Sequence, residues 1–545
     1  MPMAKQALVA IEADVHPGGE ALAERLIQIV GRENLGAGLD QRRLNSQDIW
    51  SVSAFVVDMV VTPRSLDDLC KVVETITAAG YAIAPRGSGM SYTSAYIPTT
   101  ERTVSLDLSK MNRVLDVNGD DMTVTVEAGC TWAALDQALA PKGLRTPFWG
   151  PMSGLTSTVG GGLSQLNAMF GAGHYGTSSE SVIGLAVVLA DGRVLRTGAG
   201  QKGHAPFYRN YGPDLAGLFC GDAGVFGVKA EITLRLMRRP QHDGQVSFAF
   251  DSGPELLSAM AAMARAGIAS EMCAFDPGLT KVRLKRASMS ADVKVLGALI
   301  AKENSLGKGL MSAAKTVIGG RSFIEAQEYS VHVICEGRSK AGVAEDLDAA
   351  RAIAQGRGGR EIENTIGKVI RANPFPPLNS MVGPEGERWA PVHGIASLST
   401  APVLFERLEV LFAEMAPEFE THGVYTGYLF TSLSTNALIV EPVFYWPDRR
   451  QPLIDASVEP DHLARLPVLP ENPSATAVVT EARRRVIEIC AEIGCAHFQI
   501  GRSYPYLESR DQASADLLKT IKATLDPTSA LNPGGLGLEA TARPS

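Results

Sequence analysis

The sequence lacks the features of a membrane-spanning, secreted or nucleic-acid-binding protein. It has no run of about 18 apolar residues, the length that a helix needs to cross a bilayer. Near the N-terminus, Glu12 and Asp14 interrupt any basic-then-apolar signal pattern. The net charge is −8 and there is no dense Lys/Arg stripe, which argues against a nucleic-acid surface. We therefore predict no transmembrane segment and no nucleic-acid partner.

Cysteines are few and form no recognisable pattern. There are seven, an odd number, and none stands in a C-x-x-C pair. Scattered single cysteines favour buried free thiols in a reducing compartment over a disulfide framework. This predicts a cytoplasmic protein.

Two common nucleotide-binding signatures are also missing. No G-x-x-x-x-G-K-[ST] phosphate loop occurs in the sequence. The turn at Gly87–Gly89 is followed by residues 90–98, MSYTSAYIP, which do not open a helix. The fingerprint of a nicotinamide dinucleotide fold requires a helix at that point. Both kinds of phosphate site are therefore excluded.

Glycine, in contrast, is abundant and clustered. Glycine-dense segments occur at residues 84–91, 151–162, 171–176 and 222–227. Glycine permits positive φ and close backbone approach, so such turns can present main-chain N–H groups to an anion. Together they predict a large flat ligand, with a dinucleotide as the natural candidate; the alternative is a loop-rich domain without a ligand. The run Gly160–Gly162 is predicted to lie outside helix and strand interiors, because glycine costs entropy there.

Length and periodicity predict a multidomain α+β protein. With 545 residues, the chain exceeds the size at which one hydrophobic core stops growing. A βαβ-like pattern begins near Val56, with a helix start at residues 62–65. Beyond Pro240, strands alternate with helices, which indicates a sheet covered by helices. Residues 371–396, rich in Pro and Gly, are predicted to form a long loop.

Seven segments in order carry a resemblance to a known family. They are PRGSG at 85–89, VSLDLSKMNRV at 104–114, VEAG at 126–129, GGG at 160–162, HYG at 174–176, LADGRV at 189–194 and DPTSALNPG at 526–534. From about residue 45 onward the chain resembles the FAD-linked oxidases of the vanillyl-alcohol oxidase and p-cresol methylhydroxylase superfamily, which also holds D-lactate and glycolate dehydrogenases. The resemblance implies an α+β fold with a bipartite FAD-binding domain of the p-cresol methylhydroxylase type and an α+β substrate-capping domain. The expected boundaries are an N-terminal helical segment at 1–44, the FAD-binding domain at 45–240, the cap at 241–508 and a returning C-terminal segment at 509–545.

The resemblance implies FAD as the cofactor, held by the glycine turns. Arg86 is expected to pair with the diphosphate, since a guanidinium recognises phosphate in a bidentate way. Met90 stands where some relatives carry a histidine bonded to the flavin, and Trp389 stands where others carry a tyrosine. Neither side chain can form the linkage, so we predict non-covalent FAD, with His393 as the one alternative attachment point. The expected cofactor-binding residues are Pro85, Arg86, Gly87, Ser88, Gly89, Met90, Ser91, Pro151, Ser153, Gly154, Thr158, Gly161, Gly162, His174, Tyr175, Gly176, Gly224, Val225, Gly227, Val228 and Asn532.

Candidate catalytic residues come from histidines and from the C-terminal side of the cap. Imidazole titrates near working pH, so His174, His393 and His422 are candidates for the base. Phenol-oxidising relatives use a Tyr-Arg pair, which suggests Tyr504 and Arg502 here, although the order of residue types differs. Metal-binding relatives show paired histidines that this chain lacks, so no metal site is expected.

The favoured function is an FAD-dependent oxidoreductase acting on a hydroxylated aromatic, such as a 4-hydroxybenzyl alcohol or an alkylphenol. Aromatic residues between 425 and 506 and the segment 208–219 favour this reading. One alternative is a 2-hydroxy-acid dehydrogenase, which a pair of arginines facing the flavin, such as Arg388 and Arg502, would support. Another is a non-redox flavin-binding protein or an alkyl-transferring synthase, because fold does not fix function. Expected partners are a small-molecule substrate and a redox partner (O2, a cytochrome, a quinone or an electron-transfer flavoprotein), and the resemblance also implies a homodimer.

Overall fold

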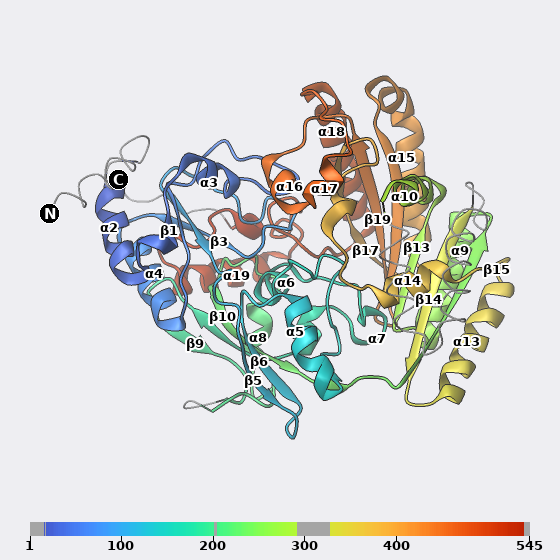
Figure 1. Cartoon of the computed structure of the whole chain (residues 1–545), viewed down its shortest axis with the longest axis horizontal. Helices are drawn as coiled ribbons and strands as arrows, with labels where there is room; N and C mark the ends of the chain where they lie inside the picture. The colour runs from blue at the N-terminus through green and yellow to red at the C-terminus, as the bar shows by residue number, and fades with distance from the viewer. Residues whose placement is uncertain (1–15, 17, 201–203, 291–327, 539–545) are drawn as a thin grey trace.

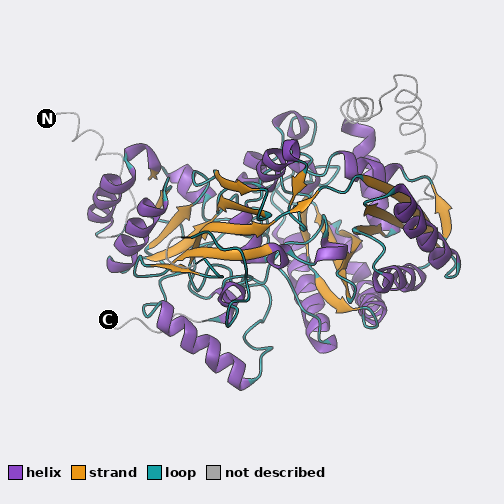
Figure 2. Cartoon of the chain, turned by 90° about the horizontal axis from the view of Figure 1, so that it is seen from below, coloured by secondary structure: helices purple, strands orange, loops and turns teal. Residues whose placement is uncertain are grey.

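The computed structural model describes residues 16, 18–200, 204–290 and 328–538. They form two lobes that lie side by side (Figure 1). The first lobe contains the N-terminal elements and the last helix, and the second contains the middle of the chain. Figure 2 shows the strands largely in the interior, with helices around them. The boundaries predicted from the sequence, at residues 44/45, 240/241 and 508/509, remain predictions.

The first lobe begins with a small sheet of order β1-β2-β4-β3, formed by Leu35–Gly36, Met59–Val61, Thr103–Asp107 and Ala82–Arg86. Strands β2, β4 and β3 are parallel. The helix α4, Leu66–Ala78, connects β2 to β3, and the Ser65 side chain caps it by accepting a hydrogen bond from the Asp68 N–H at 3.1 Å. Its apolar positions recur with helical spacing, as the sequence predicts, and they are buried: Leu69, Val72, Val73 and Ile76.

A second sheet of the first lobe has the order β5-β6-β10-β8-β9 and is antiparallel throughout. Its strands are Val114–Asn118, Thr123–Glu127, Val228–Arg235, Val182–Val188 and Val194–Arg196. Every residue of β8 is buried, because this strand carries apolar side chains toward both faces. The helix α5, Trp132–Leu139, and the short helix α6, Val159–Gln165, follow β6.

The second lobe is built on an eight-stranded antiparallel sheet of order β15-β12-β14-β13-β18-β19-β16, with β17 also paired to β19. The strands are Arg360–Ile362, His242–Phe250, Tyr329–Gly337, Glu271–Phe275, Tyr425–Leu433, Ala437–Trp446, Arg388–Pro391 and Gly394–Ser397. Long helices cover one face: α9 Gly253–Ala266, α13 Lys340–Gln355, α15 Ala401–His422 and α18 Pro473–Ile493.

Strand alternation gives the sheet of the second lobe two different faces. Tyr428, Phe430 and Phe444 point into the core under the helices. Their neighbours along the same strands, including Leu429 and Tyr445, belong to a different apolar cluster on the opposite face. That opposite face is turned toward the first lobe and therefore supplies one wall of the site described below.

The prediction of one long loop over residues 371–396 was wrong. Helix α14, Thr365–Ala372, enters this region, a short 3-10 turn covers Leu378–Met381, and β16 and β17 follow. Residues 388–391 pair with β19 in register, from Arg388 opposite Trp446 to Pro391 opposite Val443. The Pro- and Gly-rich composition hid these strands because their partner lies about fifty residues later in the chain.

The C-terminal part of the described chain returns to the first lobe. Helix α19, Gln512–Leu525, is anchored by Lys522, whose Nζ donates to the Val225 carbonyl at 2.7 Å and pairs with Asp526 at 2.5 Å. The following turn adds backbone bonds to β3, since Asn532 N–H donates to the Ile83 carbonyl at 2.8 Å. This places the C-terminal turn directly behind the end of β3, where the first glycine turn begins. Among the described helices, none combines the length and apolar character that crossing a membrane requires.

Candidate functional site

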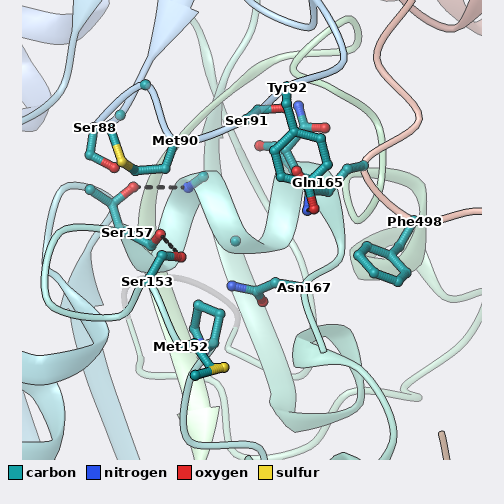
Figure 3. Close-up of a pocket in the computed structure, with 18 of the residues that line it drawn as sticks. Ser88, Met90, Ser91, Tyr92, Met152, Ser153, Ser157, Gln165, Asn167 and Phe498 are labelled. Atoms are coloured by element: carbon teal, nitrogen blue, oxygen red, sulfur yellow. Dashed lines mark hydrogen bonds between the residues drawn. The ribbon is translucent and has the colours of Figure 1, made fainter. Parts of the chain in front are cut away.

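An elongated cavity lies between the two lobes. Its empty volume is about 1930 Å3, which includes the region at its mouth that is open to solvent. One wall consists of the glycine turns of the first lobe, and the other consists of the inner face of β18 and β19, with Leu279, Arg283 and the segment 376–389. Figure 3 shows Ser88 and Met90 of the first turn near Ser153 and Ser157, and Tyr92, which follows the turn, near Gln165. The predicted glycine segments at 84–91, 151–162 and 222–227 therefore all contribute to one cavity.

The first turn follows directly from the end of β3 at Arg86. Gly89 has φ +78°, a conformation that L side chains rarely adopt, and its carbonyl accepts a hydrogen bond from the Tyr96 hydroxyl. The Arg86 guanidinium lies 4.8 Å from the centroid of the Tyr96 ring and donates to the Gln47 carbonyl at 3.1 Å. Arg86 thus lines the cavity, while its Nη1 donates to the main chain of the protein.

The Gly160–Gly162 run lies in helix α6, so the prediction that it falls outside helices was wrong. Close packing explains its composition. A Cβ on Gly160 would lie 2.6 Å from the Ala128 Cβ, and one on Gly162 would lie 2.6 Å from Asn167 Nδ2. Thr158 caps the helix by accepting from the Gly161 N–H at 3.1 Å. Each glycine lowers helix stability by about 1 kcal/mol relative to alanine. Larger residues would not fit here, because their side chains would push α6 away from its neighbours.

Two amide side chains in the cavity wall have unpaired oxygens. Gln165 Oε1 and Asn167 Oδ1 are buried and have no hydrogen-bond partner in the described structure. Both residues line the cavity, at the end of α6 and just beyond it. A buried acceptor without a partner costs about 1–3 kcal/mol, so these atoms call for a ligand with N–H or O–H donors. The site therefore fits a flavin dinucleotide: glycine turns and serine hydroxyls for its phosphates, and amide oxygens for its polar ring edge.

The predicted cofactor residues divide into two groups. Those that line the cavity are Pro85, Arg86, Gly87, Ser88, Gly89, Met90, Ser91, Pro151, Ser153, Thr158, Gly161, Gly162, Gly224, Gly227 and Val228. Those outside its lining are Gly154, His174, Tyr175, Gly176, Val225 and Asn532. Asn532 is buried behind the turns, where its Nδ2 donates to the carbonyls of Ala95 at 2.7 Å and Ala223 at 2.6 Å. It therefore braces two cavity turns from behind.

The predicted catalytic residues do not all meet at the cavity. His174, in α7 (Ala172–Tyr175), has its Nε2 3.0 Å from the Gly267 carbonyl, outside the cavity lining. Arg502 donates to Asn532 Oδ1 at 2.6 Å and to the Pro533 carbonyl at 2.8 Å, so it holds the C-terminal turn. Arg388 bonds Asp448 at 3.1 Å. The two arginines are thus engaged at different places and do not form the pair that would support a hydroxy-acid site.

His393 and Tyr504 lie behind the cavity in one hydrogen-bonded chain. His393 is fully buried, with Nε2 2.9 Å from the Tyr92 hydroxyl and Nδ1 3.0 Å from the Tyr504 hydroxyl. Burial lowers the pKa of His393 well below its usual value, so the ring is neutral. A neutral imidazole donates at one nitrogen and accepts at the other, which links the two phenols. Tyr92, which also accepts from Gln499 Nε2 at 2.9 Å, brings this chain to the cavity wall.

The cavity residues that sequence reasoning missed include Tyr92 and Glu441. Tyr92 directly follows the first glycine turn, and that position was the available signal. Glu441 lies in β19 opposite Leu429, on the face turned to the cavity. Burial raises the pKa of Glu441 to about 8. An acidic residue within the otherwise apolar strand 437–446 was the signal that could have identified it.

Three cationic side chains also line the cavity: Arg86, Lys229 and Arg283. Lys229 is paired with buried Asp222 at 2.5 Å, and Arg283 lies over the Phe275 ring, 3.8 Å from its centroid. Within the described ranges, no group of three or more His, Cys, Asp or Glu side chains is arranged to hold a metal ion.

Comparison with known proteins supports the interpretation of the cavity. Residues 57–198 match a family model described as an FAD binding domain. Glycolate oxidase subunit GlcD of Bacillus subtilis is 31% identical over 218 residues, which cover 40% of this chain and 45% of that protein. The chain thus matches less than half the length of this curated relative.

Two solved structures are similar over almost the whole chain. The structure of p-cresol methylhydroxylase with substrate bound has a TM-score of 0.72 and 16% identity, covering 97% of this chain and 98% of the other. An alkyldihydroxyacetonephosphate synthase has a TM-score of 0.67 and 16% identity, covering 96% of this chain and 87% of the other. The chain carries an FAD-binding domain and has the α+β fold of p-cresol methylhydroxylase, which confirms the predicted fold class and cofactor.

We expect the G89A variant to lose FAD while the control variant G80A keeps it. Both glycines have positive φ, +78° and +72°, so both variants carry a similar backbone strain of about 1–2 kcal/mol. A Cβ at Gly80 meets no atom within 4 Å, whereas one at Gly89 meets the Arg86 guanidinium in the cavity wall. The flavin absorbance per protein after gel filtration, titrated with FAD, should show roughly tenfold weaker binding or more for G89A, equivalent to about 1.4 kcal/mol. Equal FAD retention in the two variants would show that this turn does not bind the cofactor.

Proposed function

We propose that the chain is an FAD-dependent oxidoreductase acting on a hydroxylated aromatic substrate, such as a 4-hydroxybenzyl alcohol or an alkylphenol. The observation that carries this proposal is the composition of the wall facing the glycine turns. Apart from Glu441, Arg283 and Thr431, the side chains on this side of the cavity are mainly apolar or aromatic: Leu279, Leu429, Ile439, Val443, Tyr445, Trp389 and Phe498. Such a wall favours a planar, uncharged substrate that packs by its ring faces.

The residues of the cavity have different roles according to the wall in which they lie. FAD, when bound, supplies an acceptor for the hydride of the substrate C–H bond. The glycine turns hold the cofactor by main-chain contacts, and the apolar wall excludes water and orients the ring of the substrate. The Tyr92 hydroxyl, held by Gln499 and His393, stands in the wall as a hydrogen-bond partner for the substrate oxygen.

A 2-hydroxy acid is the second candidate substrate class. Two observations favour it: similarity to a protein named glycolate oxidase subunit, and the presence of Arg283 in the cavity lining. Two others disfavour it. Arg388 and Arg502 bond other partners. Once Glu441 is ionised, above pH about 8, its charge would repel the carboxylate of a hydroxy acid in the same cavity.

The test is anaerobic mixing of the FAD-loaded protein with two substrate panels, followed by flavin absorbance. We expect bleaching by 4-hydroxybenzyl alcohols or alkylphenols and none by D-lactate or glycolate. The reverse pattern would replace the proposed substrate class with hydroxy acids. Failure of both panels to bleach bound FAD would favour a non-redox role, such as the alkyl transfer suggested by the fold similarity to a synthase. Reoxidation by O2, a cytochrome, a quinone or an electron-transfer flavoprotein would then identify the redox partner.

A further inference from the structure

We propose that Glu441 is the catalytic base, the group that accepts the hydroxyl proton of the substrate. The inference rests on the proposed function. As the C–H hydride with its two electrons leaves for the cofactor, the O–H proton passes to a carboxylate oxygen of Glu441. For an alcohol, the C–O single bond becomes a double bond, so atoms and charge balance without a further reactant.

The position of Glu441 follows from strand register. In β18 and β19, Thr431 pairs with Ile439 and Leu429 pairs with Glu441. All four side chains line the cavity, because residues two apart in a strand share a face. Their neighbours Phe430 and Val440 point the other way, into the core under the helices. Glu441 is therefore held in an interior strand of the sheet, in register with β18, and a site built on a strand is positioned more precisely than one on a loop.

The carboxylate of Glu441 is available to accept a proton from a ligand. Within the ranges that the structure describes, its carboxylate makes no hydrogen bond or ion pair, in contrast to the buried glutamates of the same sheet, Glu271 and Glu336. It is also the sole carboxyl group in the described lining of the cavity. A carboxylate that faces the cavity with no protein partner is available to a ligand, and its desolvation is partly relieved when a hydroxyl donates to it.

The surroundings of Glu441 are mostly neutral groups. Its charge acts on Tyr92 and Tyr504, from the loops behind the cavity, and on Cys273 of β13, and burial raises the pKa of all three. Arg283 is the cation in the cavity wall on the side of helix α10, Pro277–Ser290. Burial, which disfavours the charged carboxylate, is the cause of the raised pKa of Glu441. Glu441 should therefore be protonated at low pH and become an active base as pH rises through about 8.

The experiment compares wild type with E441Q, E441D and the control E361Q. Glu361 lies in β15 of the same sheet but is exposed and pairs with Arg351 at 3.0 Å, far from the cavity lining. Anaerobic flavin reduction by a 4-hydroxybenzyl alcohol is measured across the pH range for all four proteins. Binding of a non-reacting phenol is measured separately, so that loss of binding is distinguished from loss of the chemical step.

We expect wild type and E361Q to show a reduction rate that rises through pH about 8. E441Q should be about 100-fold slower or more and should lose this rising limb, with phenol binding retained. E441D should restore part of the pH dependence. Infrared difference spectra between low and high pH provide a readout without turnover: a carboxylic C=O signal should titrate in wild type and E361Q and be absent in E441Q.

The outcomes separate the two proposals. If no substrate of either panel reduces the wild-type flavin, the proposed function falls. If wild type is reduced but E441Q has the same rate and the same pH profile, the role of Glu441 falls while the proposed function stands. A slower E441Q that keeps the rising limb would also overturn the assignment, because the titrating group would then be another residue.

Discussion

The R145M variant is expected to lose about 3–5 kcal/mol of unfolding free energy, the usual cost of breaking a buried ion pair. Arg145 lies in β7, Leu144–Arg145, of the first lobe and pairs with Glu336 in β14 of the second. Both side chains are 2% exposed. Its Nη1 donates to Glu336 Oε2 at 3.0 Å, and Nη2 bonds the other carboxylate oxygen. The pair therefore joins the two lobes.

Neighbouring charges make the loss of Arg145 costly. Glu336 also accepts from Arg371 at 2.6 Å, and Arg371 lies 3.4 Å from Glu271. Burial works to raise the pKa of Glu336, yet Arg145 and Arg371 together hold it below its usual range. Without Arg145, two buried carboxylates would share one arginine, and Glu336 would either stay charged without full compensation or take up a proton.

Urea unfolding of the FAD-loaded variants measures this effect. The control is R351M, because Arg351 pairs with Glu361 and Asp348 at the surface, where side chains are 37–76% exposed. Exposed ion pairs contribute about 0–1 kcal/mol, so R351M should unfold close to wild type. Equal losses for R145M and R351M would contradict the buried network as a major source of stability. If R145M does not fold at all, R145K tests the same contact, since it keeps the charge and loses the bidentate geometry.

The E441Q variant is expected to be more stable than wild type at high pH and equal to it at low pH. The pKa of Glu441 is raised from 4.5 to about 8 by burial, so between these values the folded state binds a proton that the unfolded state has released. Wild-type stability therefore falls as pH rises through this window, and the deficit is complete above pH about 8. At about 1.4 kcal/mol per pKa unit, reduced by partial access to the cavity, the difference should be on the order of 3 kcal/mol.

Thermal unfolding of FAD-free wild type, E441Q and E361Q at several pH values measures this difference. The curves for wild type and E441Q should meet below pH about 4.5 and separate progressively up to about 8. E361Q, with an exposed carboxylate, should follow wild type throughout. A difference between E441Q and wild type that does not change with pH would place the stabilisation in packing instead of titration.

Sequence patterns were informative wherever structure is local. The sequence predicts a strand at 183–190, and β8 spans Val182–Val188. The helical spacing after Ser65 predicts α4, because strand and helix periodicities are properties of neighbouring residues. The turn that follows β3 was also readable, since glycine at positive φ is a local requirement. These features, with the order of the seven segments, were enough to predict the α+β fold and FAD.

Contacts between distant segments were not readable in the same way. Gly160–Gly162 enters a helix because Ala128 and Asn167 leave no room for side chains, and β16 exists because β19 offers an edge. Arg502 points to Asn532 and not to the cavity, although its place beside Tyr504 suggested otherwise. In each case a partner remote in sequence decided the outcome, and local composition carries no information about that partner.

The sequence by itself determined the fold class, the cofactor and most of the turns that line its cavity, because main-chain turns of glycine are encoded where they occur. The tertiary structure alone decided which polar groups reach the substrate side. Glu441 and Tyr92 face the cavity because of the register of β18 with β19 and because of the hydrogen bonds of His393 and Gln499 to Tyr92. The physical reason is that a one-residue change of register turns every side chain of a strand to the opposite face, and register is set by packing across the whole molecule.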